Sequence, residues 1–321
     1  MSADAAIKPA VSRRPNVLAV HSVDHFSLAV PDLAVAKKFY DAFGLDVRSV
    51  SGGLELHAAA DPEHCWAKIV AGPSKRLRYV SFGVFADDFP KFRDKLAQRS
   101  LLTSPPAGVE KSAGLWLRDP HGVALELRIA EKCTPNDKKL TERKSVPAGV
   151  VGSYSRSKAP KVRPERLSHI ALFSPDVLRS VEFYSDVLGI RLSDRALDIV
   201  AFMHGAHGSD HHMIAFVKSN ASGFHHCSWA VDSLDEVGVG SAQMEAAGYA
   251  RGWGTGRHVL GSNYFFYVRD PWGSHSEYSF DIDYVPSSFD WKAADHAPED
   301  ALYLWGPNLP PDFMDNTDTA S

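Results

Sequence analysis

The hydrophobic pattern of the chain alternates short strand-like runs with helix-like stretches. A run beginning at His25 has the two-residue period of a strand, and the stretch after it has a helical period that ends at Gly44. Another strand begins at Tyr79 and is followed by an amphipathic stretch over residues 88–99. Two further strands flank the Asp-Pro-His-Gly turn at 119–122, where proline and glycine suit a type I turn. The pattern therefore predicts a mixed α+β fold.

The second half of the chain repeats the first. Residues 24–46 match residues 168–191 at an offset of 144 to 145, and residues 118–127 match residues 269–278 at an offset of 151. Several matched features in the same order, with a slowly drifting offset, indicate a duplicated domain.

The repeat and the local composition together divide the chain. Residues between the two halves are rich in Lys, Arg, Ser, Pro and Gly and lack apolar periodicity, as a linker does. After residue 285 the strand pattern is lost, but aromatic residues remain, so we expect a tail packed on the body, with residues 316–321 loose. The predicted parts are a flexible N-terminus (1–20), a first domain (21–132), a linker (133–164), a second domain (165–285) and the tail (286–321).

Composition excludes several classes of function. The 321 residues are 44% hydrophobic and 23% charged, with a formal net charge of −4, so neither nucleic acid nor an anionic membrane is an expected partner. Apolar runs are too short to cross a bilayer, and residues 1–16 lack the apolar core of a signal peptide. The three cysteines are widely spaced and odd in number. They predict no disulfide framework, and a cytoplasmic location fits best.

Histidines gather in the second half, where ten of the 15 lie from His169 onward. Side chains two apart on a strand share a face. His169 then shares its face with Ala171, and His226 with Ser228, so each imidazole has open space beside it. His225 falls on the opposite face with large apolar side chains that should pack on helices. The pattern thus favours His226 over His225 for a cavity.

A carboxylate accompanies these histidines. Glu277 lies on an aromatic-flanked strand, where an acidic side chain is costly unless it is paired or metal-bound. Two imidazoles and one carboxylate form the facial triad that holds non-haem Fe(II) and leaves positions open for substrate and O₂. We expect His169, His226 and Glu277 to bind one Fe(II), with Mn(II) as the alternative ion.

The first half carries only part of this set. His25 and Glu126 occupy the matching places, but the middle strand has Tyr79 where a histidine would stand. A core histidine inherited through the repeat is the other reading, yet Tyr79 indicates that folding does not need one. We therefore expect a first-half site that has lost metal binding.

Five segments together resemble the two-domain type I extradiol catechol dioxygenases of the vicinal oxygen chelate superfamily, over about residues 23–284. The resemblance implies tandem βαβββ modules, two per domain, whose mixed sheets curl into half-barrels around a funnel. It also implies that the metal lies in the second domain. The segments that carry it are residues 167–176, 210–216, 223–231, 256–258 and 263–278.

The resemblance also implies three catalytic residues. His212 corresponds to an acid–base histidine, and His258 and Tyr267 correspond to groups that hydrogen-bond a substrate oxygen. His275 shares a face with Glu277, and we expect it near the funnel mouth rather than on the metal.

One departure from the family concerns charge. Relatives that use acidic catechols have an arginine upstream of the His258 equivalent, and Trp253 stands there in this chain. The sequence therefore does not predict an arginine that binds a carboxylate of the substrate.

The function implied is extradiol (meta) ring cleavage, in which both atoms of O₂ enter a catecholic or trihydroxylated ring to give a muconic semialdehyde-type product. Phe202, Trp253 and Phe265 favour a substituted or bicyclic catechol. The expected partners are this small molecule, O₂ and further copies of the chain in a dimer or tetramer. The alternatives are a glyoxalase-like metalloenzyme of the same superfamily and a non-catalytic protein that binds an aromatic ligand.

Overall fold

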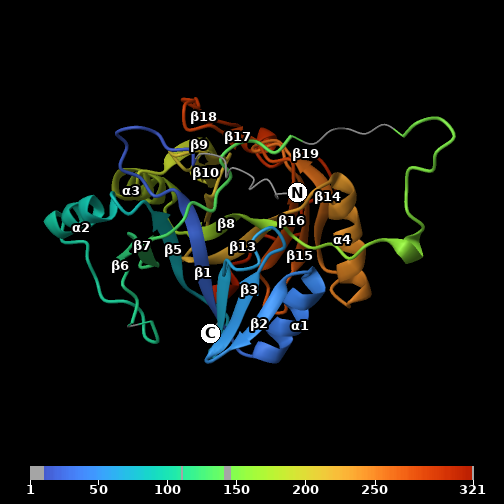
Figure 1. Ribbon diagram of the computed structural model, residues 1–321, viewed down its shortest axis with the longest axis horizontal. Helices are drawn as coiled ribbons and strands as arrows, with labels where there is room; N and C mark the ends of the chain where they lie inside the picture. The colour runs from blue at the N-terminus through green and yellow to red at the C-terminus, as the bar shows by residue number, and fades with distance from the viewer. Residues whose placement is uncertain (1–10, 110, 141–145, 320–321) are drawn as a thin grey trace, which may run out of the picture.

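The computed structural model describes residues 11–109, 111–140 and 146–319. In this range the strands form sheets of seven, ten and two strands (Figure 1). The elements of the first half are β1 (Ser22–Val30), α1 (Leu33–Phe43), β2 (Asp46–Val50), β3 (Gly53–His57), β4 (Ala67–Ala71), β5 (Arg76–Val84), α2 (Phe89–Gln98), β6 (Leu115–Arg118) and β7 (Ala124–Ile129).

The second half repeats this order and adds short elements after it. Its main elements are β8 (Arg166–Ser174), α3 (Val177–Leu188), β9 (Arg191–Ala196), β10 (Val200–His204), β12 (Ile214–Lys218), β13 (Gly223–Ala230), α4 (Leu234–Ala246), β14 (Gly252–His258), β15 (Tyr264–Arg269) and β16 (His275–Phe280). The short strands are β11 (Ser209–Asp210), β17 (Tyr284–Val285), β18 (Ala294–Asp295) and β19 (Tyr303–Trp305), and three single-turn 3₁₀ helices are η1 (Arg156–Lys158), η2 (Pro298–Asp300) and η3 (Thr317–Thr319).

The predicted βαβββ module occurs three times in full. Each copy has a strand, a helix and three strands, beginning at β1, β8 and β13, and the strand orders are β2-β3-β4-β1-β5-β7-β6 and β18-β9-β10-β12-β8-β13-β16-β15-β14-β19. The module that begins at β5 has only two strands after its helix. Pro105 and Pro106 lie where β14 would have its counterpart, and proline cannot donate to a strand ladder.

Matched residues begin and end the first helix of each half. Asp32 and Asp176 cap α1 and α3 by accepting hydrogen bonds from backbone N–H groups of the first turn. Gly44 and Gly189 follow these helices with φ values of 103° and 74°, which favour glycine. The predicted helix stop at Gly44 is confirmed.

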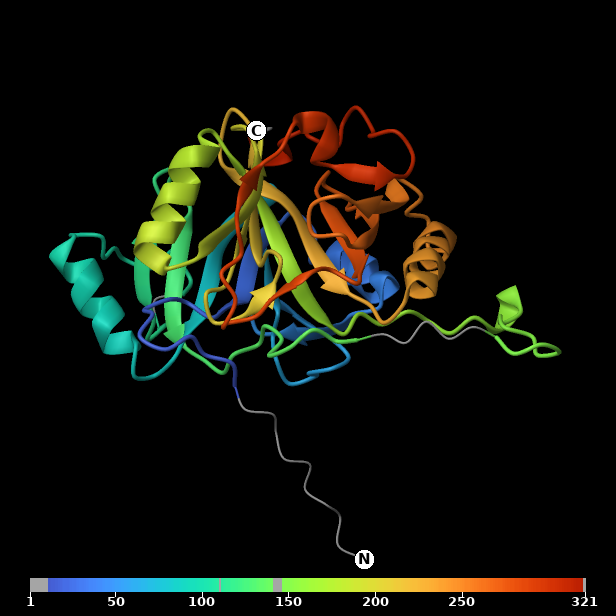
Figure 2. The same ribbon diagram turned by 90° about the horizontal axis from the view of Figure 1, so that it is seen from above.

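Helices of the first half pack beside helices of the second half. Helix α1 lies beside α4, and α2 lies beside α3, so each half contributes one helix to each end of the molecule (Figures 1 and 2). The Tyr278 ring stacks on Phe43 at a centroid distance of 4.0 Å, and its hydroxyl donates to the Phe43 carbonyl at 2.7 Å. One apolar cluster therefore runs through both halves.

The chain ends differ from the sequence prediction. Residues 1–10 lie outside the described residues, but residues 11–20 are not a flexible arm, because Ala19 and Val20 are fully buried and Arg14 pairs with Asp290. Residues 316–319 are not loose either. The buried Asp318 carboxylate pairs with Lys75 and accepts from backbone N–H groups of both halves. Short-range pattern could not predict these contacts.

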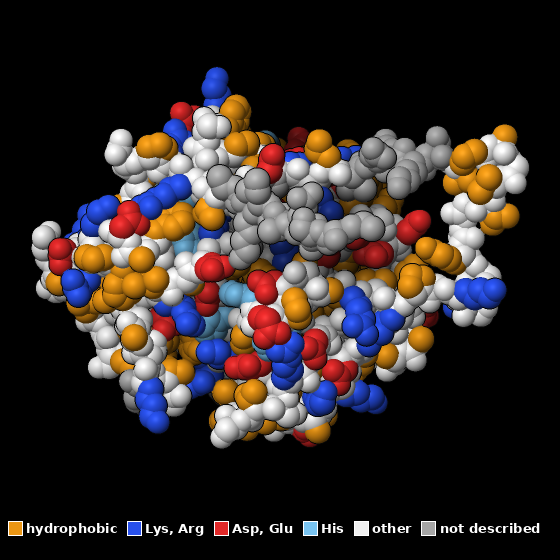
Figure 3. Space-filling model, viewed as in Figure 1, with side chains coloured by type: hydrophobic (Ala, Val, Ile, Leu, Met, Phe, Trp, Pro, Cys, Tyr) orange, Lys and Arg blue, Asp and Glu red, His pale blue; other side chains and the backbone are white. Residues whose placement is uncertain are grey.

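The surface is mixed in character. Figure 3 shows Lys and Arg side chains interspersed with Asp and Glu, and apolar side chains on a segment that projects from the body. That segment belongs to the predicted linker and exposes Val146, Val150, Val151 and Tyr154. Among the described residues, none of the helices has the length and apolar character needed to cross a bilayer.

Candidate active site

Sheet register brings the candidate metal ligands together. His169 is on β8, His226 on β13 and Glu277 on β16, which are neighbours in the ten-stranded sheet. Ser228 of β13 is in register with both His169 and Glu277, and Tyr267 of β15 extends the same row beyond Glu277. His226 precedes Ser228 by two residues and therefore faces the same side. Residues far apart in the chain thus stand on one face.

The donor atoms of the three side chains lie within 4.8 Å of one another. The Nε2 atoms of His169 and His226 are 3.3 Å apart, and Glu277 Oε2 lies 3.3 Å from the first and 3.8 Å from the second. Ligands in neighbouring positions around an ion are about 3 Å apart when the bonds are about 2.1 Å. The spacing therefore suits one common ion.

Glu277 is fully buried, and its two oxygens differ. Oε1 accepts a hydrogen bond from Asn263 Nδ2 at 3.1 Å, whereas Oε2 has no hydrogen-bond partner among the described residues. A buried carboxylate oxygen without a donor costs free energy. This oxygen, together with two imidazole nitrogens, fits a divalent cation.

The other three predicted residues border the same space. The His212 ring lies 4.0 Å from the His169 ring, and His258 Nε2 lies 3.0 Å from the Tyr267 hydroxyl. His258 Nδ1 donates to the Leu302 carbonyl at 2.6 Å, which leaves Nε2 as an acceptor. The structure thus places five of the six predicted side chains in the wall of one cavity, and Glu277 lies behind them, with its oxygens 3.3 to 3.8 Å from His169, His226 and His258.

Burial shifts the pKa values of the side chains around this cavity. It lowers the pKa of His212 well below the ordinary value, and the nearby His169 adds to this effect. Burial likewise lowers the pKa values of His226 and His258, and it raises the pKa of Tyr267 well above 10. The imidazoles are therefore neutral near pH 7 and the phenol keeps its proton.

Two neighbouring histidines differ from the sequence prediction. His225 does not lie on the packed face, because the register between β8 and β13 shifts between Phe224 and His226. This irregularity turns His225 toward the cavity, where its ring contacts Phe173 and Phe313. His275 is buried against Phe313 rather than standing at an open mouth. Strict alternation of faces fails at such a shift.

A cavity of about 220 Å³ opens beside these side chains. Its wall holds no Lys, Arg, Asp or Glu among the described residues. Tail residues close one side of it. The lining consists of five histidines, Asn263, Tyr267 and the apolar residues Ala171, Ala196, Ile199, Val200, Phe202, Ala215, Val217, Leu260, Pro298, Ala301, Leu302, Leu309, Phe313 and Met314.

Asn263 and the tail side chains have no predicted role, yet both contribute to the site. Asn263 is buried and also donates to Ser279, so it holds Glu277 in a fixed orientation. A polar residue just before an aromatic strand was the only local signal. Trp253 and Phe265, in contrast, do not line the cavity but pack behind Tyr267.

Comparisons with known proteins agree with this architecture. The model of the Glyoxalase/Bleomycin resistance protein/Dioxygenase superfamily matches residues 22–127 and 166–278, which confirms the duplication. Metapyrocatechase 2 of Cupriavidus necator is 51% identical over 94% of this chain and 93% of its own length.

Solved structures share the fold at low identity. The Mn(II)-bound glyoxalase from Novosphingobium aromaticivorans has a TM-score of 0.73 at 24% identity, covering 92% of this chain and 94% of its own. BphC, a halotolerant catechol dioxygenase, has a TM-score of 0.72 at 20% identity, covering 94% and 98%. The predicted α+β fold of repeated modules is confirmed. The chain therefore belongs to the glyoxalase/bleomycin resistance protein/dioxygenase superfamily and, within it, to the type I extradiol ring-cleaving dioxygenases.

Proposed function

We propose that His169, His226 and Glu277 hold one divalent ion at which this chain cleaves uncharged catechols. The observation that carries the proposal is the buried, unpartnered Glu277 Oε2 facing two imidazole nitrogens. Fe(II) is the first candidate for this donor set. Mn(II) is the second, and a 22% identical relative from Geobacillus genomosp. 3 is named a manganese-dependent 2,3-dihydroxybiphenyl 1,2-dioxygenase.

An ion held by His169, His226 and Glu277 would supply a Lewis acid and a one-electron redox centre for a catechol and O₂. His212 is neutral and lies against His169, so its imidazole can accept a proton from a catechol hydroxyl and later donate it to an oxygen atom derived from O₂ as the O–O bond breaks. The Tyr267 hydroxyl donates to His258 Nε2 beside Glu277, and this O–H would have to turn from His258 to donate to a developing oxyanion when substrate binds.

The composition of the cavity wall favours uncharged substrates. Because its described lining has no charged side chain, a carboxylate on the substrate would lose its hydration without gaining a partner. Phe202, Val200 and Val217 instead offer apolar surface to an alkyl or aryl substituent. Catechol and its apolar derivatives are the class proposed.

A substrate panel tests this choice. We expect Fe(II)-loaded protein to consume O₂ with catechol, 3-methylcatechol and 2,3-dihydroxybiphenyl at kcat/KM values at least about 100-fold above those for protocatechuate, since burying an unpaired charge costs several kcal/mol. Equal values for the acidic catechol contradict the proposal. Absence of O₂ uptake with every catechol, together with turnover of a glutathione hemithioacetal, favours a glyoxalase-like activity.

A homo-oligomer in the cytoplasm completes the proposal. The exposed Val150, Val151 and Tyr154 of the projecting segment support a contact between copies. Three free cysteines support a reducing compartment. Light scattering on a Val151→Asp and Tyr154→Asp double variant should give a lower mass than the parent chain, and an unchanged mass means that this segment is not the contact.

A further inference from the structure

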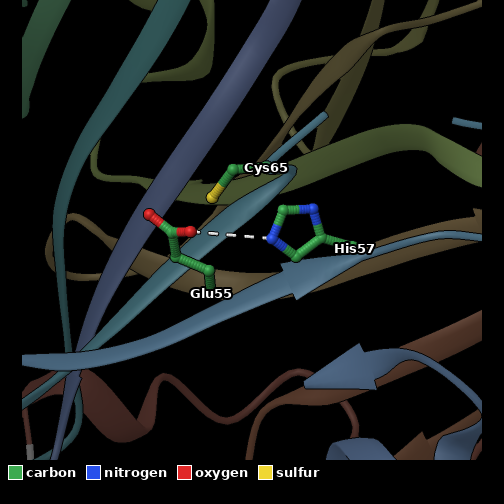
Figure 4. Close-up of side chains that lie close together, drawn as sticks. All are labelled: Glu55, His57 and Cys65. Carbon is green, nitrogen blue, oxygen red and sulfur yellow. Dashed lines mark ion pairs between the residues drawn. The ribbon is translucent and has the colours of Figure 1, made fainter. Parts of the chain in front are cut away.

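A second group of metal-ligand side chains lies in the first half, away from the active site. Glu55 and His57 are two apart on β3 and so share a face, and Cys65 lies just before β4, which pairs with β3. Figure 4 shows the carboxylate, the imidazole and the thiol facing one another. One donor atom from each lies within 4.8 Å of the others. No motif in the sequence predicted a role for this group.

His57 gives the independent indication of a ligand. The side chain is only 3% exposed, and neither ring nitrogen has a hydrogen-bond partner among the described residues. Nε2 lies 3.6 Å from Glu55 Oε2, beyond hydrogen-bond length but aimed at it (Figure 4). Buried polar groups are nearly always satisfied, so an imidazole without a partner requires an explanation.

We propose that Glu55, His57 and Cys65 bind a zinc-type divalent cation, with water in the fourth position. Thiolate, imidazole and carboxylate are the zinc donor set, and a thiolate disfavours magnesium and calcium. In a tetrahedral site the donor atoms stand about 3.5 Å apart. The Glu55–His57 pair already has this spacing.

The side chains that must shift to bring all three donor atoms to this spacing are the ones that can move. Because no donor separation exceeds 4.8 Å, closing the widest one requires a shift of no more than about 1 Å. Glu55 is 32% exposed and Cys65 is half-buried, whereas His57 is fixed by burial. A cation can therefore enter from the solvent side and draw the two mobile ligands toward the imidazole.

The charges near Glu55, His57 and Cys65 and the protonation state of the Cys65 thiol are compatible with binding of a cation. Burial raises the pKa of the Cys65 thiol to about 12, and Glu55 adds to the effect. The thiol is thus protonated without metal, and binding releases one proton, so the affinity should rise with pH. Lys68 is the one cation acting on Cys65, and Asp24 opposes it. The site would tie β3 to the segment before β4.

Cobalt(II) titration of the full chain tests the proposal. A thiolate-to-cobalt charge-transfer band reports sulfur coordination, and His169, His226 and Glu277 cannot produce it because they contain no sulfur. At saturation we expect this band to correspond to one cobalt ion per chain, to be displaced by Zn²⁺, and to vanish in Cys65→Ser. Cys133→Ser is the matched control, because Cys133 is also half-buried with its thiol pKa raised to about 12.

Two further measurements keep the outcome decisive. Unchanged Fe(II)-dependent ring cleavage shows that Cys65→Ser is folded, and failure of the proposed function leaves the cobalt band unaffected. If Cys65→Ser does not fold, the exposed Glu55→Gln decides, with at least tenfold weaker cobalt binding expected. A band that is absent from the parent chain at millimolar cobalt, survives Cys65→Ser, or is lost in Cys133→Ser overturns the proposal.

Discussion

Two pairs of adjacent histidines show how finely the active site depends on single residues. In each pair the rings contact through Nδ1 atoms, at 2.7 Å for His225 and His226 and at 3.1 Å for His211 and His212. Of these four histidines, His226 is the one whose Nε2 lies near Glu277, at 3.8 Å from Oε2. Face alternation in the sequence selected His226 as the ligand because it placed His225 on the packed face. That reason is wrong, since the register shift turns His225 toward the cavity as well.

The first prediction separates the histidines at 225 and 226. His226→Ala removes one of three proposed ligands and should lower metal affinity by more than the roughly 10- to 100-fold typical of losing a supporting residue. His225→Ala should retain close to one ion per chain. Metal content after reconstitution and O₂ uptake measure both variants. Full metal content in His226→Ala, or its loss only in His225→Ala, would show that the ligand assignment is wrong.

The second prediction concerns His212. Because its neutral imidazole contacts the His169 ring without joining the donor set, His212→Phe should keep the metal but lower kcat by about 10²- to 10⁴-fold, as expected for a lost acid–base group. Steady-state kinetics and metal analysis on the same sample test this. Wild-type kcat in the metal-loaded variant would remove His212 from the proposed chemistry.

At the level of elements, strands, helices and their repetition follow from local pattern, and contacts between distant segments do not. The period of two at His25 and the stop at Gly44 are local, so both could be predicted. The tail that closes the cavity has little regular structure, and Leu309 and Phe313 meet the site only through long-range packing. No local rule assigns such side chains to a cavity.

The matching strands of the first half show what a repeated element can lose. His25 lies in the corresponding place, but its Nε2 contacts the Tyr79 hydroxyl at 3.2 Å and its Nδ1 contacts Asp24 at 2.7 Å. Glu126 accepts hydrogen bonds from Ser81 and Ser112, so both carboxylate oxygens are satisfied. Each of these side chains is therefore already paired with a protein group.

The third prediction follows from this pairing. Tyr79→His restores the residue types of a triad, yet it should not add a metal ion, because the serines still hold Glu126 and Asp24 still holds His25. Metal analysis should give the same stoichiometry as the parent chain. A triple variant with Ser81→Ala and Ser112→Ala is the informative comparison, since it frees the carboxylate. An extra equivalent in Tyr79→His alone would mean that the tyrosine was the only obstacle.

Across the whole molecule, the halves are joined by polar contacts as well as by the shared core. The rings of His21 from the first half and His207 from the second both contact Phe85, at centroid distances of 4.7 and 5.1 Å. Arg13 lies over the same ring, and Lys132 and Asp24 act on His21. Both histidines are fully buried, so their charged forms are disfavoured in the assembled molecule.

The last prediction is a loss of stability in mild acid. Burial lowers the pKa values of His21 and His207 from 6.5 to about 4. The unfolded chain then binds more protons between these values, so the stabilising effect is complete above pH 6.5 and is lost as the pH falls toward 4. Lowering the pH from 7.5 to 5 should therefore reduce the free energy of unfolding by about 2 kcal/mol for each of the two histidines. Urea unfolding of a His21→Asn and His207→Asn double variant should show a shallower pH dependence than the parent chain in the same metal state. Parallel curves would mean that the acid sensitivity originates elsewhere, for instance at the histidines of the metal centre.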